Sequence, residues 1–270
     1  MALITQTRKP DWGRRIERAI DLAEQHPSTA EILIFYRRIL DFQQTLYEIA
    51  SRPALAAGGE TAFLEQLDFD AAIRQLPALL SLVRKVGTSK LAREAARLGQ
   101  ATSAEPRQML HEFVNTPDGD DTTPRSFFAR VLLQPLAEHL AAQTPSPAGF
   151  SGSRCPVCGA RPLVAVLRPE GDGGKRFLVC SFCLTEWEFR RILCPVCGEE
   201  DHAKLPRYTA DGISAVRVEA CDTCHYYLKS VDMTVDGLAV PLVDEVATTP
   251  LDVWATEHGY KKVSLNLMGF

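Results

Sequence analysis

The sequence lacks any apolar stretch of about 20 residues, the length that a membrane-spanning helix requires. Near its start there is no apolar run long enough for a secretion signal, and Arg14 and Arg15 are followed by a helical pattern. The chain also lacks a strong charge of one sign, because its formal net charge is -4 over 270 residues. We therefore expect a cytoplasmic protein without membrane insertion and without the basic surface that attracts nucleic acid.

Cysteine is absent before residue 155, and every cysteine after that point belongs to a Cys-x-x-Cys motif. The pentapeptide CPVCG occurs at residues 155 to 159 and again at residues 194 to 198. Each copy is followed by one further motif, Cys180 with Cys183 and Cys221 with Cys224. In the reducing cytoplasm, regular pairs of this kind favour metal ligation over disulfide bonds.

The two CPVCG motifs begin an internal repeat of knuckle, strand, polar turn, strand, second knuckle and aromatic-rich strand. Two such knuckles brought together by a hairpin form a tetrahedral site of four thiolates. The repeat favours sequential pairing of the motifs, whereas a cross-brace would join the first motif to the third. Sequential pairing predicts two metal ions, one held by Cys155, Cys158, Cys180 and Cys183 and the other by Cys194, Cys197, Cys221 and Cys224.

Several details of the motifs limit their chemistry. Gly159 and Gly198 follow the knuckles where a positive φ is expected. A redox-active thiol pair needs a βαβ setting, and these motifs lie among hairpins. A catalytic metal site keeps an open position, but four thiolates fill a tetrahedral ion. His225, which follows Cys224, and Asp201 and His202 are therefore interpreted as surface residues, and no catalytic residue is predicted.

The first half of the chain shows a helical period. From residue 28 to residue 50, apolar side chains recur at steps of three and four, and Ser28 with Glu31 matches a capping box. Thr123 and Pro124 are the expected start of a later helix, which Pro135 should kink or end early. The apolar stripe consists of Ile32, Phe35, Ile39, Phe42, Leu46 and Ile49. The other expected helices span residues 12–25, 69–86, 88–99, 105–115 and 124–142.

The residue pattern changes after a linker rich in proline, glycine and serine. Short β-type runs separated by turns follow it, so the fold class is α+β, with an N-terminal all-helical domain and two tandem rubredoxin-like or zinc-ribbon modules. The expected limits are residues 1–143 for the helical domain, 144–154 for the linker, 155–193 for the first metal ribbon and 194–270 for the second with a C-terminal tail.

Aromatic side chains flank the second knuckle of each module. They are expected to pack beside the knuckles, and the alternative is a surface for a client protein. The residues are Trp187, Phe189, Tyr226 and Tyr227, and Trp254 of the tail is expected to dock in the same way.

The segments CPVCG, CSFCLTEWEFRRILCPVCG and ACDTCHYYLKSVDM, followed by LDVWATEHGYKKVSLNLMGF, resemble the FdhE family of formate dehydrogenase accessory proteins. The resemblance extends over nearly the whole chain, and all eight cysteines match the family pattern. It implies a protein that is not an enzyme, that binds the catalytic subunit of a respiratory formate dehydrogenase in the cytoplasm, and that carries iron in its cysteine sites. The residues alone also allow zinc, and two other functions stay open: a rubredoxin-like electron carrier and a zinc-ribbon nucleic-acid-binding protein.

Overall fold

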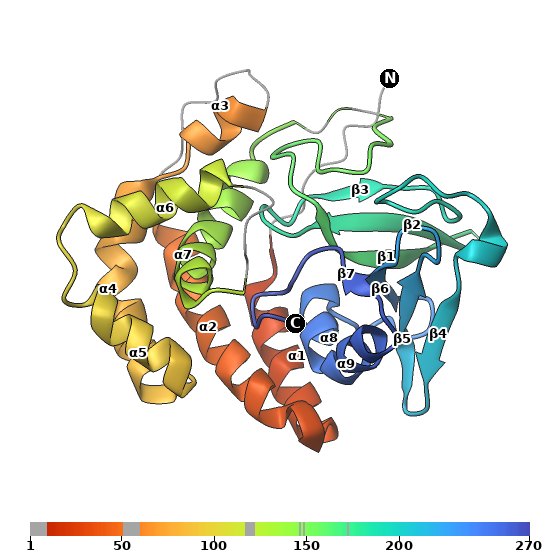
Figure 1. Ribbon diagram of the computed structural model, residues 1–270, viewed down its shortest axis with the longest axis horizontal. Coiled ribbons are helices and arrows are strands. Elements are labelled where there is room, and N and C mark those ends of the chain that lie inside the picture. The colour runs from red at the N-terminus through yellow and green to blue at the C-terminus, as the bar shows by residue number, and fades with distance from the viewer. Residues whose placement is uncertain (1–9, 51–59, 117–121, 146, 148, 172) are drawn as a thin grey trace.

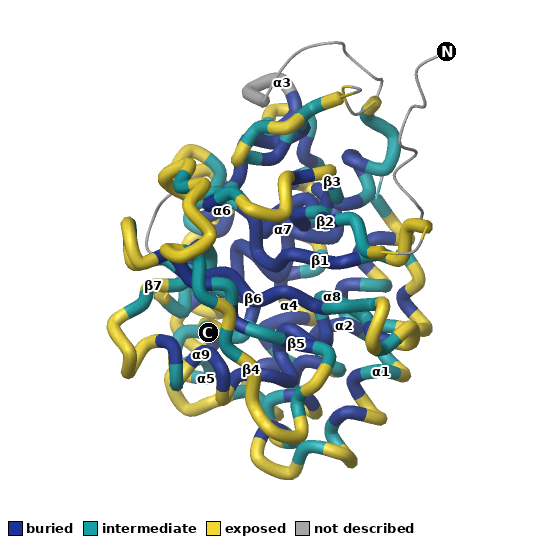
Figure 2. The backbone as a smooth tube through the Cα atoms, turned by 90° about the vertical axis from the view of Figure 1, so that its right-hand side faces the viewer, coloured by how far each residue is buried: buried dark blue, intermediate teal, exposed yellow. Residues whose placement is uncertain are grey.

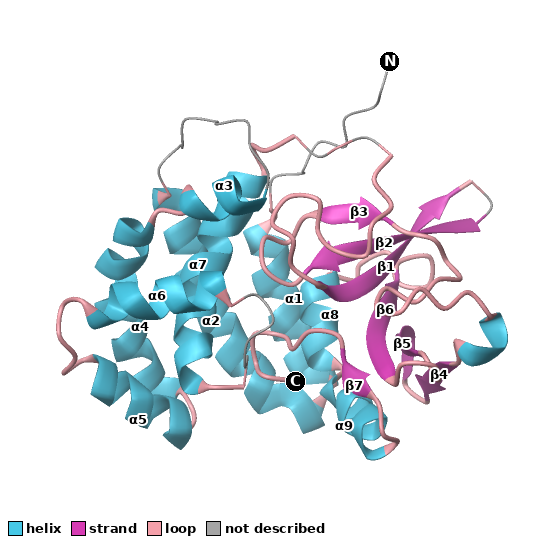
Figure 3. Cartoon of the chain, turned by 45° about the horizontal axis from the view of Figure 1, so that its top comes forward, coloured by secondary structure: helices cyan, strands magenta, loops and turns pink. Residues whose placement is uncertain are grey.

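The computed structural model describes residues 10–50, 60–116, 122–145, 147, 149–171 and 173–270. Helices occupy the chain up to residue 141, and a β-sheet begins at residue 162, which confirms the α+β fold class (Figures 1 and 3). The helices of the first part are α1 (Trp12–Gln25), α2 (Ala30–Ile49), α3 (Glu60–Glu65), α4 (Phe69–Val86), α5 (Ser89–Leu98), α6 (Glu105–Asn115) and α7 (Pro124–Ala141).

Side chains cap several of these helices as their sequences require. The carboxylate of Asp11 accepts a hydrogen bond from the Arg14 N–H at 2.9 Å at the start of α1, and Asp68 does the same for Ala71 at 2.8 Å at the start of α4. At the start of α7, the Thr123 hydroxyl accepts from the Ser126 N–H at 3.0 Å, as expected. These bonds satisfy backbone donors that the first helical turn leaves free.

The predicted capping box of Ser28 and Glu31 is wrong. Residues Pro27–Thr29 form a 3-10 turn, and α2 begins at Ala30 without a side-chain cap. The hydroxyl of Thr29 donates to the Ala247 carbonyl at 3.1 Å, a partner 218 residues away. Proline fixes the turn one residue before the expected cap, and a tertiary contact takes the place of the local one.

The buried face of α2 is broader than its sequence stripe. Ile39 and Leu46 are buried as expected, but Ile49 is 44% exposed. Leu33, Leu40 and Gln43 are buried as well, on a neighbouring part of the helix surface. The stripe therefore lies near one edge of the face that packs against α1, α4 and α7.

Helix α7 is the central helix of this part and is buried on nearly all sides. It continues through Pro135 to Ala141, so the proline does not end it early. Figure 2 shows α7 among the buried segments of the molecule. A helix buried all round shows little periodicity in its sequence, because apolar residues occupy every face.

The strands of both ribbons join in one sheet of order β3-β2-β1-β6-β5-β4, with β7 paired to β6. Antiparallel pairs build each ribbon, and the parallel pair of β1 with β6 joins the two, with Val164 opposite Lys229. The strands are β1 (Pro162–Glu170), β2 (Gly173–Cys180), β3 (Glu186–Glu188), β4 (Arg207–Ala210), β5 (Ile213–Ala220), β6 (Tyr226–Asp232) and β7 (Lys261–Lys262).

The C-terminal tail, for which the sequence analysis predicted no helix or strand, has regular structure. It forms helices α8 (Pro241–Ala247) and α9 (Thr249–Glu257), each with proline in its first turn, before β7. Helix α8 lies against α1 and α2 on one side and β1 and β6 on the other. Arg18 of α1 binds Asp244 of α8 at 2.5 Å and Asp236 at 2.6 Å. The tail therefore fastens the sheet to the helices.

Buried apolar side chains form two clusters. The larger one contains residues of the helices together with Cys155, Phe182 and Trp187 of the first ribbon. The smaller one includes Val218 of the second ribbon and Leu251 of α9, and it also contains Val164 and Val179 of the first ribbon. The larger cluster contains residues from before and after the expected linker. It marks no boundary at that point, so the domain limits given above remain predictions. Within the described residues, no helix is both long and apolar enough to span a membrane.

Candidate metal centres

The sulfurs of the first cluster, Cys155, Cys158, Cys180 and Cys183, all lie within 4.8 Å of one another. The Cys155 and Cys183 sulfurs are 3.5 Å apart, and those of Cys158 and Cys180 are 3.4 Å apart. These are separate thiols, because a disulfide would hold its sulfurs at about 2.05 Å. A tetrahedral ion with metal–sulfur bonds of about 2.3 Å spaces its sulfurs at about 3.8 Å, so the four sulfurs fit such an ion.

The second cluster has the same arrangement. The sulfurs of Cys194, Cys197, Cys221 and Cys224 again lie within 4.8 Å of one another. Cys194 and Cys224 are 3.7 Å apart at their sulfurs, and Cys197 and Cys221 are 3.6 Å apart. The structure therefore groups the motifs sequentially, the first with the second and the third with the fourth, and not as a cross-brace.

All four knuckles share one backbone geometry. The N–H of each first cysteine donates to the carbonyl five residues later, as in Cys155 to Ala160 and Cys194 to Glu199, both at 2.9 Å. The residue after each second cysteine has a positive φ. Its φ is +70° at Gly159, +59° at Leu184, +78° at Gly198 and +57° at His225. The sequence identified the two glycines but gave no signal for Leu184 and His225, which carry a Cβ in the left-handed region.

Backbone N–H groups inside the knuckles point at sulfur. Val157 donates to the Cys155 sulfur at 3.4 Å, Phe182 to Cys180 at 3.3 Å, and Val196 to Cys194 at 3.4 Å. Such donors stabilise negative charge on sulfur. This is the environment that four thiolates around a divalent cation need, since their charge exceeds that of the ion.

The thiol pKa values differ within each cluster. Burial alone would raise the pKa of Cys155, but hydrogen bonds from the three neighbouring thiols lower it far below the usual range. Burial raises the pKa values of Cys180 and Cys183, and hydrogen bonds with Cys155 and Cys158 raise them further.

In the second cluster the pKa of Cys197 is lowered, against the effect of burial, by the Glu199 N–H and the other thiols. Burial raises the pKa values of Cys194 and Cys224. The lowered pKa values of Cys155 and Cys197 favour the thiolate form at these two sulfurs. A divalent cation would displace the protons that remain on the other thiols of the cluster. Metal binding is therefore coupled to proton release.

The first cluster is enclosed by the rest of the protein. Its cysteines are at most 5% exposed. The Ser181 carbonyl, inside the second knuckle, accepts hydrogen bonds from Arg130 at 3.2 Å and Gln134 at 3.1 Å, both on α7. The Phe182 ring packs on Phe113 of α6 with ring centroids 5.8 Å apart. This knuckle is therefore part of the interface between ribbon and helices.

The second cluster lies at the edge of the molecule. Cys194 and Cys221 are buried, but Cys197 is exposed and Cys224 is partly exposed. Polar contacts surround it: the Thr223 hydroxyl donates to Glu199 at 2.6 Å, and Arg190 pairs with Glu200 at 2.8 Å. The two copies of the repeat thus have similar sulfur geometry and different surroundings.

Histidines near the motifs do not join the clusters that the described residues form. His202 is exposed, and the neighbouring Asp201 carboxylate caps a short 3-10 turn by accepting from the Ala203 N–H at 3.0 Å. His225 is exposed too, and its backbone N–H donates to the Cys221 carbonyl at 2.8 Å. All three residues have the surface positions expected of them.

The flanking aromatic residues mostly pack inside. Trp187, Phe189 and Tyr227 are at most 4% exposed, and the Trp187 indole donates to the Gly152 carbonyl at 3.0 Å. Tyr226 is partly buried. Trp254 packs on Tyr208, with ring centroids 4.6 Å apart, and so docks on the second ribbon as expected.

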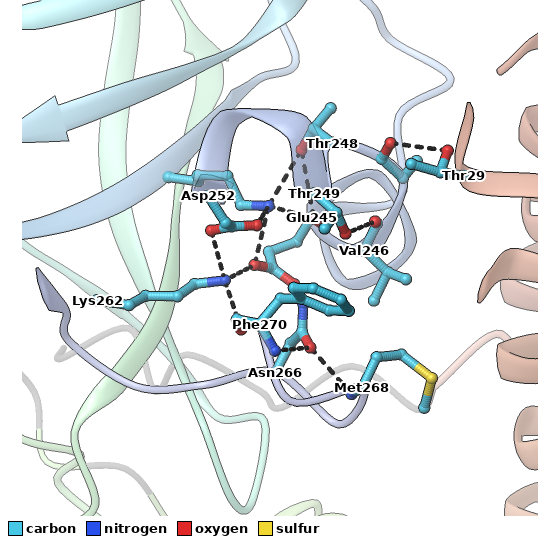
Figure 4. A network of polar contacts seen from close by, with 12 residues as sticks. Thr29, Glu245, Val246, Thr248, Thr249, Asp252, Lys262, Asn266, Met268 and Phe270 are labelled. Atoms are coloured by element: carbon cyan, nitrogen blue, oxygen red, sulfur yellow. Dashed lines mark hydrogen bonds and ion pairs between the residues drawn. The ribbon is translucent and has the colours of Figure 1, made fainter. Parts of the chain in front are cut away.

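A buried group of four charges was missed by the sequence analysis. Lys229 of β6 binds Asp252 of α9 at 2.6 Å and Glu245 of α8 at 3.1 Å, and Lys262 of β7 contacts both carboxylates. All four side chains are at most 5% exposed. Figure 4 shows Lys262 pointing toward Glu245, Asp252 and the Phe270 carbonyl, with Asn266 beside Glu245. Two lysines and two carboxylates leave the group without net charge. Its ion pairs hold α8, α9 and β7 to β6.

Comparisons with known proteins agree with this architecture. Family models described as the FdhE central domain and the FdhE C-terminal domain match residues 154–191 and 192–268. An FdhE homolog of Pseudomonas aeruginosa is 30% identical over 95% of this chain and 89% of its own. One of Aquifex aeolicus is 29% identical over 92% of each chain. The crystal structure of the FdhE protein from Pseudomonas aeruginosa superimposes with a TM-score of 0.78 at 24% identity, covers 97% of both chains, and has the same fold.

Proposed function

Because the chain belongs to the FdhE family, we propose that it is an accessory protein that a respiratory formate dehydrogenase requires in order to become active. It binds the catalytic subunit of that enzyme in the cytoplasm and does not insert into the membrane. The observation that supports a binding role over catalysis is the pair of four-sulfur clusters, since four thiolates fill a tetrahedral ion and leave no position for a substrate.

We further propose that each cluster holds one metal ion. The ligands are Cys155, Cys158, Cys180 and Cys183 in the first site, and Cys194, Cys197, Cys221 and Cys224 in the second. The resemblance to the family favours iron, and four sulfur donors accept zinc equally well. The ions hold pairs of hairpin turns together, a role that needs geometry and no change of oxidation state.

Deletion of the gene should abolish respiratory formate dehydrogenase activity, because the catalytic subunit would be made but not matured. Enzyme activity in membranes, together with an immunoblot of the catalytic subunit, measures this. A plasmid copy of the wild-type gene is the control. The tagged protein should also retain the catalytic subunit when purified from cytosol. Normal activity in the deletion strain would contradict the proposal.

Zinc separates this function from electron transfer. Zinc has no accessible redox change, so protein loaded with zinc should still bind the catalytic subunit and restore activity to extract of the deletion strain. An electron carrier would restore activity only with iron. Salt-sensitive retention on DNA or heparin would instead indicate a nucleic-acid-binding protein, and we expect none.

A further inference from the structure

Two identical pentapeptides have opposite surroundings in this protein. In the first CPVCG, Cys158 is 5% exposed and Val157 is 4% exposed. In the second, Cys197 is exposed and Val196 is 38% exposed. The knuckle geometry is the same in both, so the sequence of the motif does not cause the difference. The tertiary structure does.

The second knuckles of the two clusters show the same difference in burial. CSFC of the first cluster presents Phe182, which packs on Phe113, and a carbonyl that α7 holds through Arg130 and Gln134. CDTC of the second presents Asp222 and Thr223, both exposed. Thr223 occupies the position of Phe182, and its hydroxyl donates to Glu199 of the same ribbon. Asp222 likewise has a partner within residues 194–270, because the Tyr260 hydroxyl donates to its carboxylate at 2.6 Å.

Exchange of a thiolate-bound ion requires an incoming ligand to reach the metal or a sulfur to leave it. At the second cluster, Cys197 and Cys224 can be reached from solvent without any movement of the chain. At the first, whose cysteines are at most 5% exposed, an incoming ligand needs a local opening of the surrounding residues, such as separation of the second knuckle from α6 and α7. The two sites therefore face different kinetic barriers even though their donors are the same.

We propose that the second cluster is the exchange site of this protein, at which a soft divalent ion such as Zn²⁺ or Fe²⁺ is taken up and given up, while the first cluster keeps its ion as a fixed part of the core. The division of roles rests on the metal-binding part of the proposed function and is independent of the client enzyme. The second ribbon can thus lose and regain its ion while the helices and the first ribbon stay assembled.

The test uses full-length protein loaded with zinc and an excess of the chelator 4-(2-pyridylazo)resorcinol, whose absorbance reports released zinc. The metal content is measured first. Fewer than two ions per chain at that stage would count against the proposed metal sites themselves. With two ions present, we expect release in two phases of equal amplitude, the second at least about tenfold slower because it waits for local opening. Release of both ions at one rate would overturn the proposal.

Alkylation assigns the phases without any substitution. Iodoacetamide added after the fast phase should modify Cys194, Cys197, Cys221 and Cys224, as peptide mass spectrometry would show, and should leave the first cluster unmodified. Modification of the first cluster at this stage would overturn the proposal.

Matched variants test the cause of the difference. Phe182→Ala removes the ring that covers the first cluster, and Thr223→Ala changes the equivalent position of the second. We expect Phe182→Ala to accelerate the slow phase several-fold and leave the fast phase unchanged, and Thr223→Ala to leave the slow phase unchanged. A slow phase that Phe182→Ala does not alter would show that the packing of this knuckle does not retain the ion.

Discussion

At the scale of single residues, the knuckles depend on four positions with positive φ, and only two of them are glycine. A residue with a Cβ in this region is destabilised by about 1–2 kcal/mol relative to the right-handed region. His225 accepts this conformation while its side chain is exposed beside Cys224. Its backbone, and not its imidazole, therefore explains its place in the knuckle.

Replacing His225 tests this reading. His225→Gly should retain two metal ions per chain and raise the free energy of unfolding by about 0.5–1 kcal/mol, because glycine relieves the backbone strain but has a more disordered unfolded state. His225→Ala is the control, since it removes the imidazole and keeps the Cβ. Metal analysis and urea unfolding measure both variants. Loss of an ion from either one would identify His225 as a ligand.

At the scale of elements, helices α8 and α9 are held to β6 and β7 by the buried charges. Burial alone would raise the pKa of Glu245, but Lys229 and Lys262 lower it from 4.5 to about 2. A carboxyl group with a lowered pKa in the folded state contributes stability above its unfolded pKa and loses it as the pH falls through the folded value. The contribution of Glu245 is therefore complete above about pH 4.5 and is lost toward pH 2.

We expect Glu245→Gln to lower the free energy of unfolding by about 3 kcal/mol near neutral pH, the amount that a shift of this size represents. The difference from wild type should shrink as the pH falls from 4.5 toward 2. Urea unfolding at several pH values measures it, and comparison with wild type cancels the effect of acid on the thiolates. Glu200→Gln, in the exposed pair with Arg190, is the control and should change little. A difference that does not vary with pH would contradict this account.

At the scale of the whole molecule, the knuckles of the first ribbon belong to the apolar core of the helices, whereas the second ribbon packs mainly on a smaller core that it shares with α9 and with β1 and β2. Loss of one ion should therefore have unequal consequences. Separate modules, as the sequence predicts them, would each unfold alone and leave the helices intact. Arg130, Gln134 and Phe113 contact the second knuckle of the first cluster. These contacts indicate that unfolding of the first ribbon also destabilises α6 and α7.

Cys180→Ser and Cys221→Ser are equivalent substitutions in the two repeats, and each should remove one ion. Cys180→Ser should also increase amide hydrogen exchange in α6 and α7, because the knuckle that packs on them loses its metal. Cys221→Ser should increase exchange in the second ribbon and leave α6 and α7 protected. Hydrogen exchange followed by mass spectrometry resolves these segments. Equal protection of α6 and α7 in the two variants would show that the ribbons are energetically independent of the helices.

The sequence alone determined the features that depend on local chemistry. Cys-x-x-Cys spacing and the internal repeat predicted which sulfurs come together, because a knuckle and a hairpin are short-range structures. Helical periodicity located most helices of the first part, and Thr123 was recognised as a cap. Local patterns failed where a distant partner decided the outcome, as at Thr29, which bonds to Ala247 in place of forming a capping box.

Only the tertiary structure decided how the pieces combine. The parallel pairing of β1 with β6 merges two ribbons into one sheet, and the tail folds into helices held by Lys229, Glu245, Asp252 and Lys262, which come from four different elements. The two CPVCG motifs are identical in sequence, so no reading of their letters could show that one is enclosed and the other exposed. Burial depends on what packs against a segment, and here α6 and α7 cover the first cluster while the second faces solvent.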